Sequence, residues 1–235
     1  MYQIINNMKK ILVLSIFSLT LFVTCKNSNT AQKQEVPSIK MIKYYVRYIE
    51  QSKELQLEAK YYNENDSAIA MPNGVFVAEF KLEPKNLPRE GWMHRFIKRP
   101  AFFDSLYIFE YKYSDSYSAK DSVLFPKFDS FRLATPKISK KNGGLVTWNG
   151  AALDQEDGLT LLFEDAAGNN ITNNHVGLTR GPKVEIRPDF LEALSKGKAI
   201  LRVVHKKSAI SKIGDTRYVK LTEYYRSPIE VEITD

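Results

Sequence analysis

The sequence predicts an all-β protein in which two tandem antiparallel β-sandwiches follow a signal peptide and a short disordered tether. Runs rich in Tyr, Phe, Val and Ile recur at intervals of roughly ten residues, as in sandwich folds. Turn-forming clusters of Asn, Asp, Gly, Pro and Ser separate these runs. Apolar and polar residues alternate within several of them, and only one stretch reads as a helix.

The signal peptide is predicted over residues 1–24. Lys9 and Lys10 precede an apolar run, Ile11–Val23, that only Ser and Thr interrupt. A helix of that length spans roughly 20 Å, less than the hydrocarbon core of a bilayer at roughly 30 Å. The run therefore fits a secretory signal better than a transmembrane helix, with Met8 as well as Met1 a suitable start.

The end of this run, "LFVTC" (Leu21–Cys25), resembles the lipobox of bacterial lipoproteins of the Bacteroidetes type. Thr24 stands where Gly, Ala or Ser is usual, and Phe22 where Leu is most frequent. The resemblance implies that Cys25, the only cysteine, is acylated and anchors the chain by lipid to the outer membrane, facing the periplasm. The alternative is an ordinary secretory peptide or membrane anchor with an incidental cysteine.

Residues 25–37 are predicted to be a disordered tether, because they are polar and almost free of apolar side chains. The whole chain carries 34 basic and 27 acidic residues, a formal charge of +7. Basic residues alternate with acidic ones and form no run of four or more, so we predict no nucleic-acid partner. A solvated surface, or one near anionic lipid or envelope polymers, fits this distribution.

The first sandwich is predicted over residues 38–133. In the second of its runs, Leu55, Leu57 and Ala59 alternate with polar residues, which is typical of a half-buried strand. The predicted strand segments of this section are 39–50, 53–66, 74–84, 104–116 and 121–133.

The second sandwich is predicted over residues 134–235. Its strand segments are 143–150, 159–163, 181–188, 198–207 and 217–235. A helix of about two turns is expected from Pro188 to a stop at Gly197. Trp148, the hairpin "LTLLFEDAAGN" and the stretch Phe190–Leu201 resemble immunoglobulin-like or fibronectin-III-like sandwiches. This is an architectural likeness, since the chain lacks the Cys…Trp…Cys pattern.

Catalytic motifs are not found in the sequence. The three histidines, His94, His175 and His205, have no local zinc-site spacing, and His205 is predicted at the surface. We predict no enzyme activity, no cofactor and no metal. The alternative is an accessory envelope hydrolase that uses non-local residues such as His94, Asp104 and Glu110.

Two acidic clusters could supply oxygen ligands to Ca²⁺, although neither has EF-hand spacing. The first contains Asp154, Glu156 and Asp157. The second contains Glu164, Asp165, Asn169 and Asn170. Tight turns use the same residue types, and we favour that interpretation.

The candidate binding segment is Leu87–Phe103, which is long and poorly periodic. Aromatic and Arg side chains of this kind form binding hot spots when exposed. The candidate contact residues are Arg89, Trp92, Arg95, Phe96, Phe102 and Phe103. The segment is either a contact surface or a loop packed over the first sandwich. Tyrosines elsewhere in the chain suit sugar stacking or protein contact, or simply fill strand faces.

These observations predict a non-enzymatic lipoprotein of the cell envelope that displays β-sandwich modules for binding a protein or glycan partner. A glycan-binding component of a polysaccharide-uptake system is the main alternative. Paired aromatics spaced like sugar rings would distinguish it from a protein binder.

Overall fold

The computed structural model describes residues 38–126 and 129–235, which lie within one unit of the chain, Pro37–Asp235. The predicted signal peptide, the tether and Cys25 lie outside the described residues. Within the described residues, no helix combines the length and the apolar character needed to cross a membrane.

The described chain is almost entirely β-structure, as predicted. The one helix in this part of the chain is α2 (Pro188–Leu191). The strands are β1 (Ile39–Ile49), β2 (Glu54–Asn63), β3 (Ala68–Ile69), β4 (Val75–Val77), β5 (Phe80–Leu87), β6 (Gly91–Lys98), β7 (Leu106–Ser114), β8 (Tyr117–Leu124), β9 (Asp129–Leu133), β10 (Lys137–Ser139), β11 (Gly144–Asn149), β12 (Asp157–Asp165), β13 (Asn170–Val176), β14 (Lys183–Ile186), β15 (Gly197–Ile213), β16 (Thr216–Tyr225) and β17 (Ile229–Thr234).

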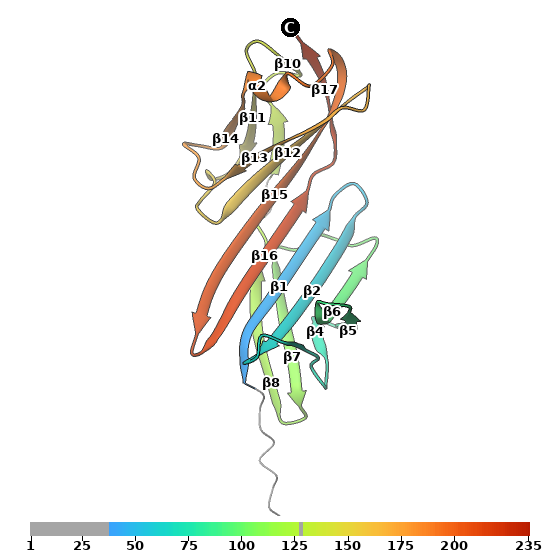
Figure 1. The fold of residues 1–235 in the computed structure, drawn as a ribbon, viewed down its shortest axis with the longest axis vertical. Helices are drawn as coiled ribbons and strands as arrows, with labels where there is room; N and C mark the ends of the chain where they lie inside the picture. Colours follow the sequence, from blue (N-terminus) through green and yellow to red (C-terminus); the bar gives the residue numbers. More distant parts are fainter. Residues whose placement is uncertain (1–37, 127–128) are drawn as a thin grey trace, which may run out of the picture. The chain divides into compact units, whose positions relative to one another are not determined.

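One large mixed sheet contains most of these strands (Figure 1). Its order is β10-β17-β15-β16-β1-β2-β6-β5-β4-β7-β8, with β12 and β13 attached at β15 and β3 at β2. A second sheet has the order β14-β11-β9. The prediction of purely antiparallel sheets is wrong in two places. The pair β1–β16 is parallel, from Met41 opposite Arg217 to Ile49 opposite Tyr225, and β10 and β17 are parallel too.

A first cluster of buried side chains lies between β1, β2 and β16 on one side and β4, β7 and β8 on the other. Alternation along β1 and β2 turns every second side chain inward, because successive residues of a strand face opposite sides. The buried set from these two strands is Ile42, Tyr44, Val46, Tyr48, Leu55, Leu57, Ala59 and Tyr61. The predicted period of two over residues 55–59 is therefore confirmed.

A second cluster joins β12, β15 and β17 to β11 and β14. Leu159, Leu161 and Phe163 of β12 contribute alternate residues to it. Trp148 stacks on Phe131 with ring centroids 5.4 Å apart. The predicted helical start at Pro188 is confirmed, but α2 ends after four residues.

Strand β15 contributes side chains to the second cluster and pairs with β16, a strand of the first. Its residues as far as Lys207 pair with β12, whereas Val204–Ile213 pair with β16. Strand β16 lies beside β1, and its Tyr224 belongs to the first cluster. Strand β16 follows residue 134 and contributes to the first cluster, so that cluster contains residues from both sides of the predicted division between 38–133 and 134–235.

Candidate binding surface

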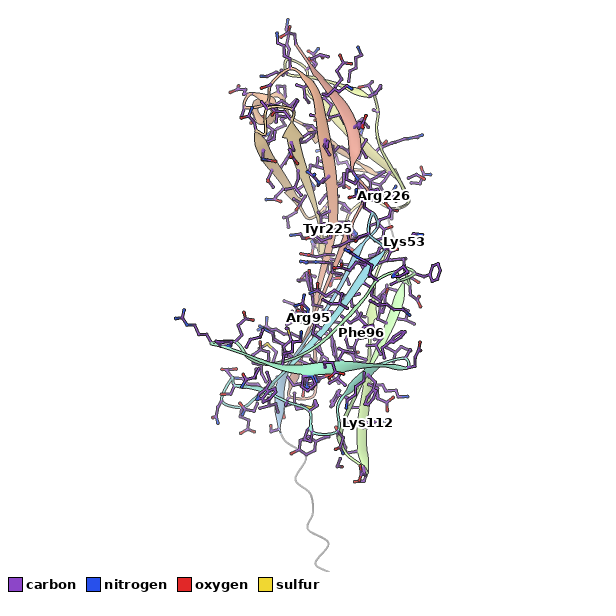
Figure 2. All side chains as sticks on the ribbon, turned by 90° about the vertical axis from the view of Figure 1, so that its right-hand side faces the viewer. Lys53, Arg95, Phe96, Lys112, Tyr225 and Arg226 are labelled. Carbon is purple, nitrogen blue, oxygen red and sulfur yellow. The ribbon has the colours of Figure 1, made fainter. Side chains whose placement is uncertain are left out.

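The outer face of the β15–β16–β1 part of the sheet carries a linked group of polar and aromatic side chains. Alternation that buries Tyr44, Val46 and Tyr48 turns Tyr45 and Arg47 to the opposite side of β1. The parallel register then places Arg47 beside Glu223 on β16. In Figure 2, the labelled Tyr225 and Arg95 lie on this side of the sheet, whereas Phe96 lies between the two layers.

Glu223 is at the centre of this group and is only 7% exposed. Its Oε2 accepts hydrogen bonds from the hydroxyls of Tyr45 (2.6 Å) and Tyr225 (3.1 Å). Arg47 donates to the same oxygen through Nη2 at 3.1 Å, and Lys206 Nζ lies 3.4 Å from Oε1. We call these five residues, Tyr45, Arg47, Lys206, Glu223 and Tyr225, the Arg47 face.

The rings of the Arg47 face hold the guanidinium in place. The Arg47 guanidinium carbon lies 5.2 Å from the ring centroids of both Tyr45 and Tyr225. Such cation–π contacts stabilise and orient Arg, which otherwise loses much side-chain entropy on binding. The Arg47 face is therefore preorganised.

Electrostatics keep Glu223 ionised. Burial raises the pKa of its carboxyl, but the hydrogen bond from Tyr45 and the charge of Lys206 outweigh it, so the pKa is lowered overall. Burial and the neighbouring Glu223 carboxylate raise the pKa of the Tyr45 and Tyr225 hydroxyls. At neutral pH one carboxylate thus faces two cations and two neutral phenols, and the face has a net positive charge.

The same face continues onto β2 and β6. A cross-strand row runs from Lys206 through Glu223, Arg47 and Gln56 to Ile97, as the strand registers show. Ile97 is an exposed apolar side chain in this row. This row therefore combines the charged side chains around Glu223 with the exposed apolar side chain of Ile97, a combination that suits contact with another protein.

The predicted binding segment Leu87–Phe103 is not one loop. Its centre forms β6, which pairs with β2 and β5, so the prediction of an aperiodic loop is wrong. Met93 and His94 are adjacent and both buried, which conceals the alternation of the strand. Strand β6 therefore sends the candidate residues in opposite directions.

Two of the six candidates point into the first cluster. Phe96 stacks on Phe80 with ring centroids 4.9 Å apart. Phe103 makes edge contacts with Tyr48, Phe125 and Tyr224.

The other four candidates lie at the surface. Arg89 occupies a turn with φ of 68°, and Arg95 pairs with Glu58 at 3.2 Å. Trp92 is 37% exposed and Phe102 is 92% exposed. The structure thus does not gather the six residues into one surface.

The sequence did not single out the Arg47 face. "KYYVRY" and "TEYYR" each place polar and aromatic residues at alternate positions, which is a signal for one strand face. Only the parallel pairing of β1 and β16, which are remote in sequence, brings Arg47 to Glu223.

His205 is buried, so its predicted surface position is wrong. The side chain is 1% exposed, and its Nε2 lies 2.9 Å from Oδ1 of Asp157. Burial lowers the pKa of His205, against the opposing effect of Asp157. The pair lies in the part of β15 that has β12 on one side and β16 on the other, where His205 is opposite both Leu159 and Tyr224.

A lysine occupies the first acidic cluster. Nζ of Lys207 lies 2.6 Å from Asp154, 3.6 Å from Glu156 and 3.7 Å from Asp157. The ammonium supplies the positive charge that a bound Ca²⁺ would bring.

In the second acidic cluster, Asp165 organises a turn. Its carboxylate accepts hydrogen bonds from the backbone N–H groups of Ala167, Asn169 and Ser195. These hydrogen bonds, that from Ser195 foremost, lower the pKa of Asp165. Both clusters therefore have structural partners, and the described residues contain no group of three metal-ligating side chains suited to an ion.

The residues of the alternative hydrolase site each have other partners. His94 is buried and accepts a hydrogen bond from the Met71 N–H at 3.0 Å. Asp104 accepts from the Leu106 N–H, and Glu110 pairs with Lys120 at 3.3 Å. No arrangement of acid, base and nucleophile arises from these contacts.

A second surface feature is a groove of about 700 Å³ along β12, β15 and β17. Ile200, Glu230 and Glu164 form one cross-strand row in it. Glu164 pairs with Arg202, and Glu232 pairs with Lys137.

Comparisons with known proteins give a distant likeness only. No family model matches the chain, and no curated protein matches it. A solved structure described as "Crystal structure of Dpr11 IG1 bound to DIP-gamma IG+IG2" is similar over 84% of this chain and 98% of that chain. The identity is 8% and the TM-score 0.20, so the likeness to immunoglobulin-domain proteins is distant and carries no argument about function.

Proposed function

We propose that this chain is a non-enzymatic lipoprotein of the cell envelope, lipid-anchored through Cys25, that binds a protein partner. The observation that carries the binding part is the Arg47 face, where a guanidinium is held between two tyrosine rings above a nearly buried carboxylate. Arg and Tyr held in a fixed geometry are the residues that dominate protein interfaces. The lipobox-like "LFVTC" supports the anchor.

A protein partner fits this face better than a glycan. Sugar rings stack on open aromatic faces, whereas Arg47 already lies over the rings of both Tyr45 and Tyr225. The net positive charge also favours a partner surface with carboxylates. Glycan binding within a polysaccharide-uptake system is kept as the alternative for the experiment below.

We further propose that the two buried clusters are the cores of the two immunoglobulin-like sandwich modules that the sequence predicts. Each cluster draws its side chains from two layers of strands. On this proposal β15 belongs to both modules, and β16 completes the first.

The anchor is tested by measuring the intact mass of the protein in the membrane fraction of a bacterial host that processes lipoproteins of this type. The wild type is compared with a Cys25→Ala variant. We expect a mature chain that begins at Cys25 and carries two or three acyl chains, with both the added mass and the membrane association lost in the variant. An unmodified chain cleaved elsewhere would refute the anchor.

The binding face is tested by photo-crosslinking in the envelope, with a crosslinking amino acid in place of the exposed Ile97. A protein crosslink that disappears in the Arg47→Ala/Tyr225→Ala double variant supports the proposal. Lys137→Ala, which breaks an exposed ion pair on β10, is the matched control and should keep the crosslink. Retention of the crosslink in the double variant would contradict the proposal. Polysaccharide binding that the double variant abolishes would favour the glycan alternative.

A further inference from the structure

Part of β15 is an unpaired sheet edge. Strand β12 ends its pairing with β15 at Lys207, whereas β16 continues to Ile213. Beyond Lys207, β15 therefore has a strand on one side only, and in Figure 1 its lower half forms the left margin of the sheet. Ser208 and residues 210–213 are exposed, and Ala209 is half-buried.

The hydrogen-bonding groups of this edge point outward at alternate residues. Ser208 donates its N–H to the carbonyl of Glu156 at 2.9 Å, which is the side away from β16. Residues of an antiparallel strand alternate in the direction of their N–H and C=O groups. Ile210 and Lys212 therefore direct theirs to the same open side, where no strand of the described residues pairs with them.

A groove lies along the inner face of the same edge. It measures about 320 Å³ and is lined by Ala209 and Lys207 of β15, Lys220 and Thr222 of β16, and Leu124 with Ser122 of β8, beside Glu156. A strand added next to β15 would turn alternate side chains toward this groove. The edge thus offers both backbone groups and room for side chains.

Uncompensated positive charge lies at the far end of this edge. Residues 206–217 contain four basic residues and one acidic residue, Asp215, but Lys206 and Lys207 are already paired with carboxylates. Lys212 and Arg217 are direct cross-strand neighbours, and neither has an ion-pair partner among the described residues. Like charges opposite each other destabilise a strand pair, so an acidic neighbour would relieve this repulsion.

We propose that the edge Ser208–Ile213 is a strand-addition site for an extended, acidic segment of a partner protein. Main-chain hydrogen bonds to Ile210 and Lys212 supply the affinity, and the groove and the basic side chains select the sequence. A second copy of this chain is a poorer occupant, because pairing two such edges adds a further Lys212 to the same cations. This site is distinct from the Arg47 face and does not depend on lipid at Cys25.

The test uses the full chain, purified in detergent, and a synthetic peptide of alternating valine and glutamate with blocked ends. We expect saturable binding by calorimetry and slower amide hydrogen exchange over residues 208–213. The same peptide with N-methylated alternate amides cannot form the ladder, and a valine–lysine peptide has the wrong charge. Both should bind at least about tenfold more weakly, which corresponds to the loss of about 1.4 kcal/mol.

Two protein variants form a matched pair. Ile210→Pro removes an N–H that faces away from β16, so the β15–β16 ladder keeps its bonds, and Pro is tolerated at such edge positions. Ile210→Thr keeps the N–H and a β-branched side chain. We expect the peptide to bind Ile210→Thr normally and Ile210→Pro about tenfold more weakly.

A charge variant keeps the proposal testable if Ile210→Pro fails to fold. Lys212→Glu/Arg217→Glu should reverse the preference, so that the valine–lysine peptide becomes the better ligand. Equal binding of the N-methylated peptide, absence of binding by the valine–glutamate peptide, or edge-dependent dimerisation of the chain would each overturn the proposal.

Discussion

Glu223 receives more side-chain interactions than its position on a sheet face would suggest, with two tyrosine hydroxyls, Arg47 and Lys206 around one carboxylate. Glu223→Gln removes the charge while nearly preserving the shape. Because hydrogen bonds to a charged, nearly buried group are worth about 1.5–3 kcal/mol, we expect the free energy of unfolding at pH 7 to fall by about 2 kcal/mol. Urea denaturation measures this change.

The pH dependence of the unfolding free energy of the same variant is a second test of the Glu223 carboxylate. The pKa of Glu223 is lowered in the folded state, so its stabilisation is present above the ordinary glutamate pKa of about 4.3 and is lost as the pH falls through the folded-state value. The difference between wild type and Glu223→Gln should therefore shrink below about pH 4. Glu230→Gln, at an exposed position on β17, is the control and should change stability by less than about 0.5 kcal/mol. A difference that stays constant with pH would contradict the central role of the carboxylate.

His205 should make the protein less stable in mild acid. Burial lowers its pKa in the folded state, and Asp157, Asp154 and Lys207 are the charged groups that influence it. As the pH falls below about 6.5, the unfolded chain therefore binds a proton before the folded chain does, and stability decreases. His205→Gln keeps a donor for Asp157 but does not titrate. Between about pH 6.5 and 5 we expect the wild type to lose about 1 kcal/mol more than the variant, and parallel curves would refute this.

The burial of individual residues could be predicted from the sequence only in part. The alternation of Leu55, Leu57 and Ala59 with polar residues predicts their inward position correctly, because all three are apolar and lie on one side of the strand. His205 follows the same kind of alternation but stands beside Lys206 and Lys207, and those lysines suggest a surface. Its burial depends on Asp157, which is remote in sequence and supplies the hydrogen bond that makes burial tolerable.

At the scale of elements, the sequence predicts strands better than strand partners. The segments around β1, β2, β7, β12 and β15 are where periodicity places them. The parallel pairing of β1 with β16 could not be predicted, because pairing joins residues that no local pattern relates. Strand β6 escapes prediction for another reason. It buries the adjacent residues Met93 and His94, which face opposite sides of the strand, so its burial shows no period of two.

The turn before β12 depends on one lysine of β15. Lys207 reaches Asp154, Glu156 and Asp157. Burial acts to lower the pKa of its ammonium, but these carboxylates outweigh that effect and raise the pKa overall. Lys207→Gln leaves three carboxylates near each other, so we expect the free energy of unfolding to fall by about 1 kcal/mol in urea denaturation.

Calcium separates the two interpretations of this acidic turn. In Lys207→Gln, millimolar Ca²⁺ should recover part of the lost stability, because oxygen ligands without a cation suit that ion. The wild type should show no calcium-dependent change in its melting temperature, since the ammonium already occupies the cluster. A calcium response of the wild type would instead support the metal-site hypothesis.

At the scale of the whole molecule, β15 and β16 connect the two buried clusters through continuous backbone. Leu201 and Val203 of β15 lie in the second cluster, and β16, the next strand, contributes Tyr224 to the first. Loss of either core would expose part of this shared strand pair. The two clusters should therefore unfold together, unlike tandem modules joined only by a linker.

Leu57→Ala and Leu161→Ala test this coupling. Both side chains are fully buried, Leu57 in the first cluster and Leu161 in the second. Each truncation should cost about 3 kcal/mol through lost apolar contact and the cavity left behind. Calorimetry should show one transition in the wild type that shifts as a whole in both variants, with matching calorimetric and van't Hoff enthalpies. Two transitions, of which each variant moves only one, would instead indicate independent modules, because a core that unfolds alone leaves the stability of the other unchanged.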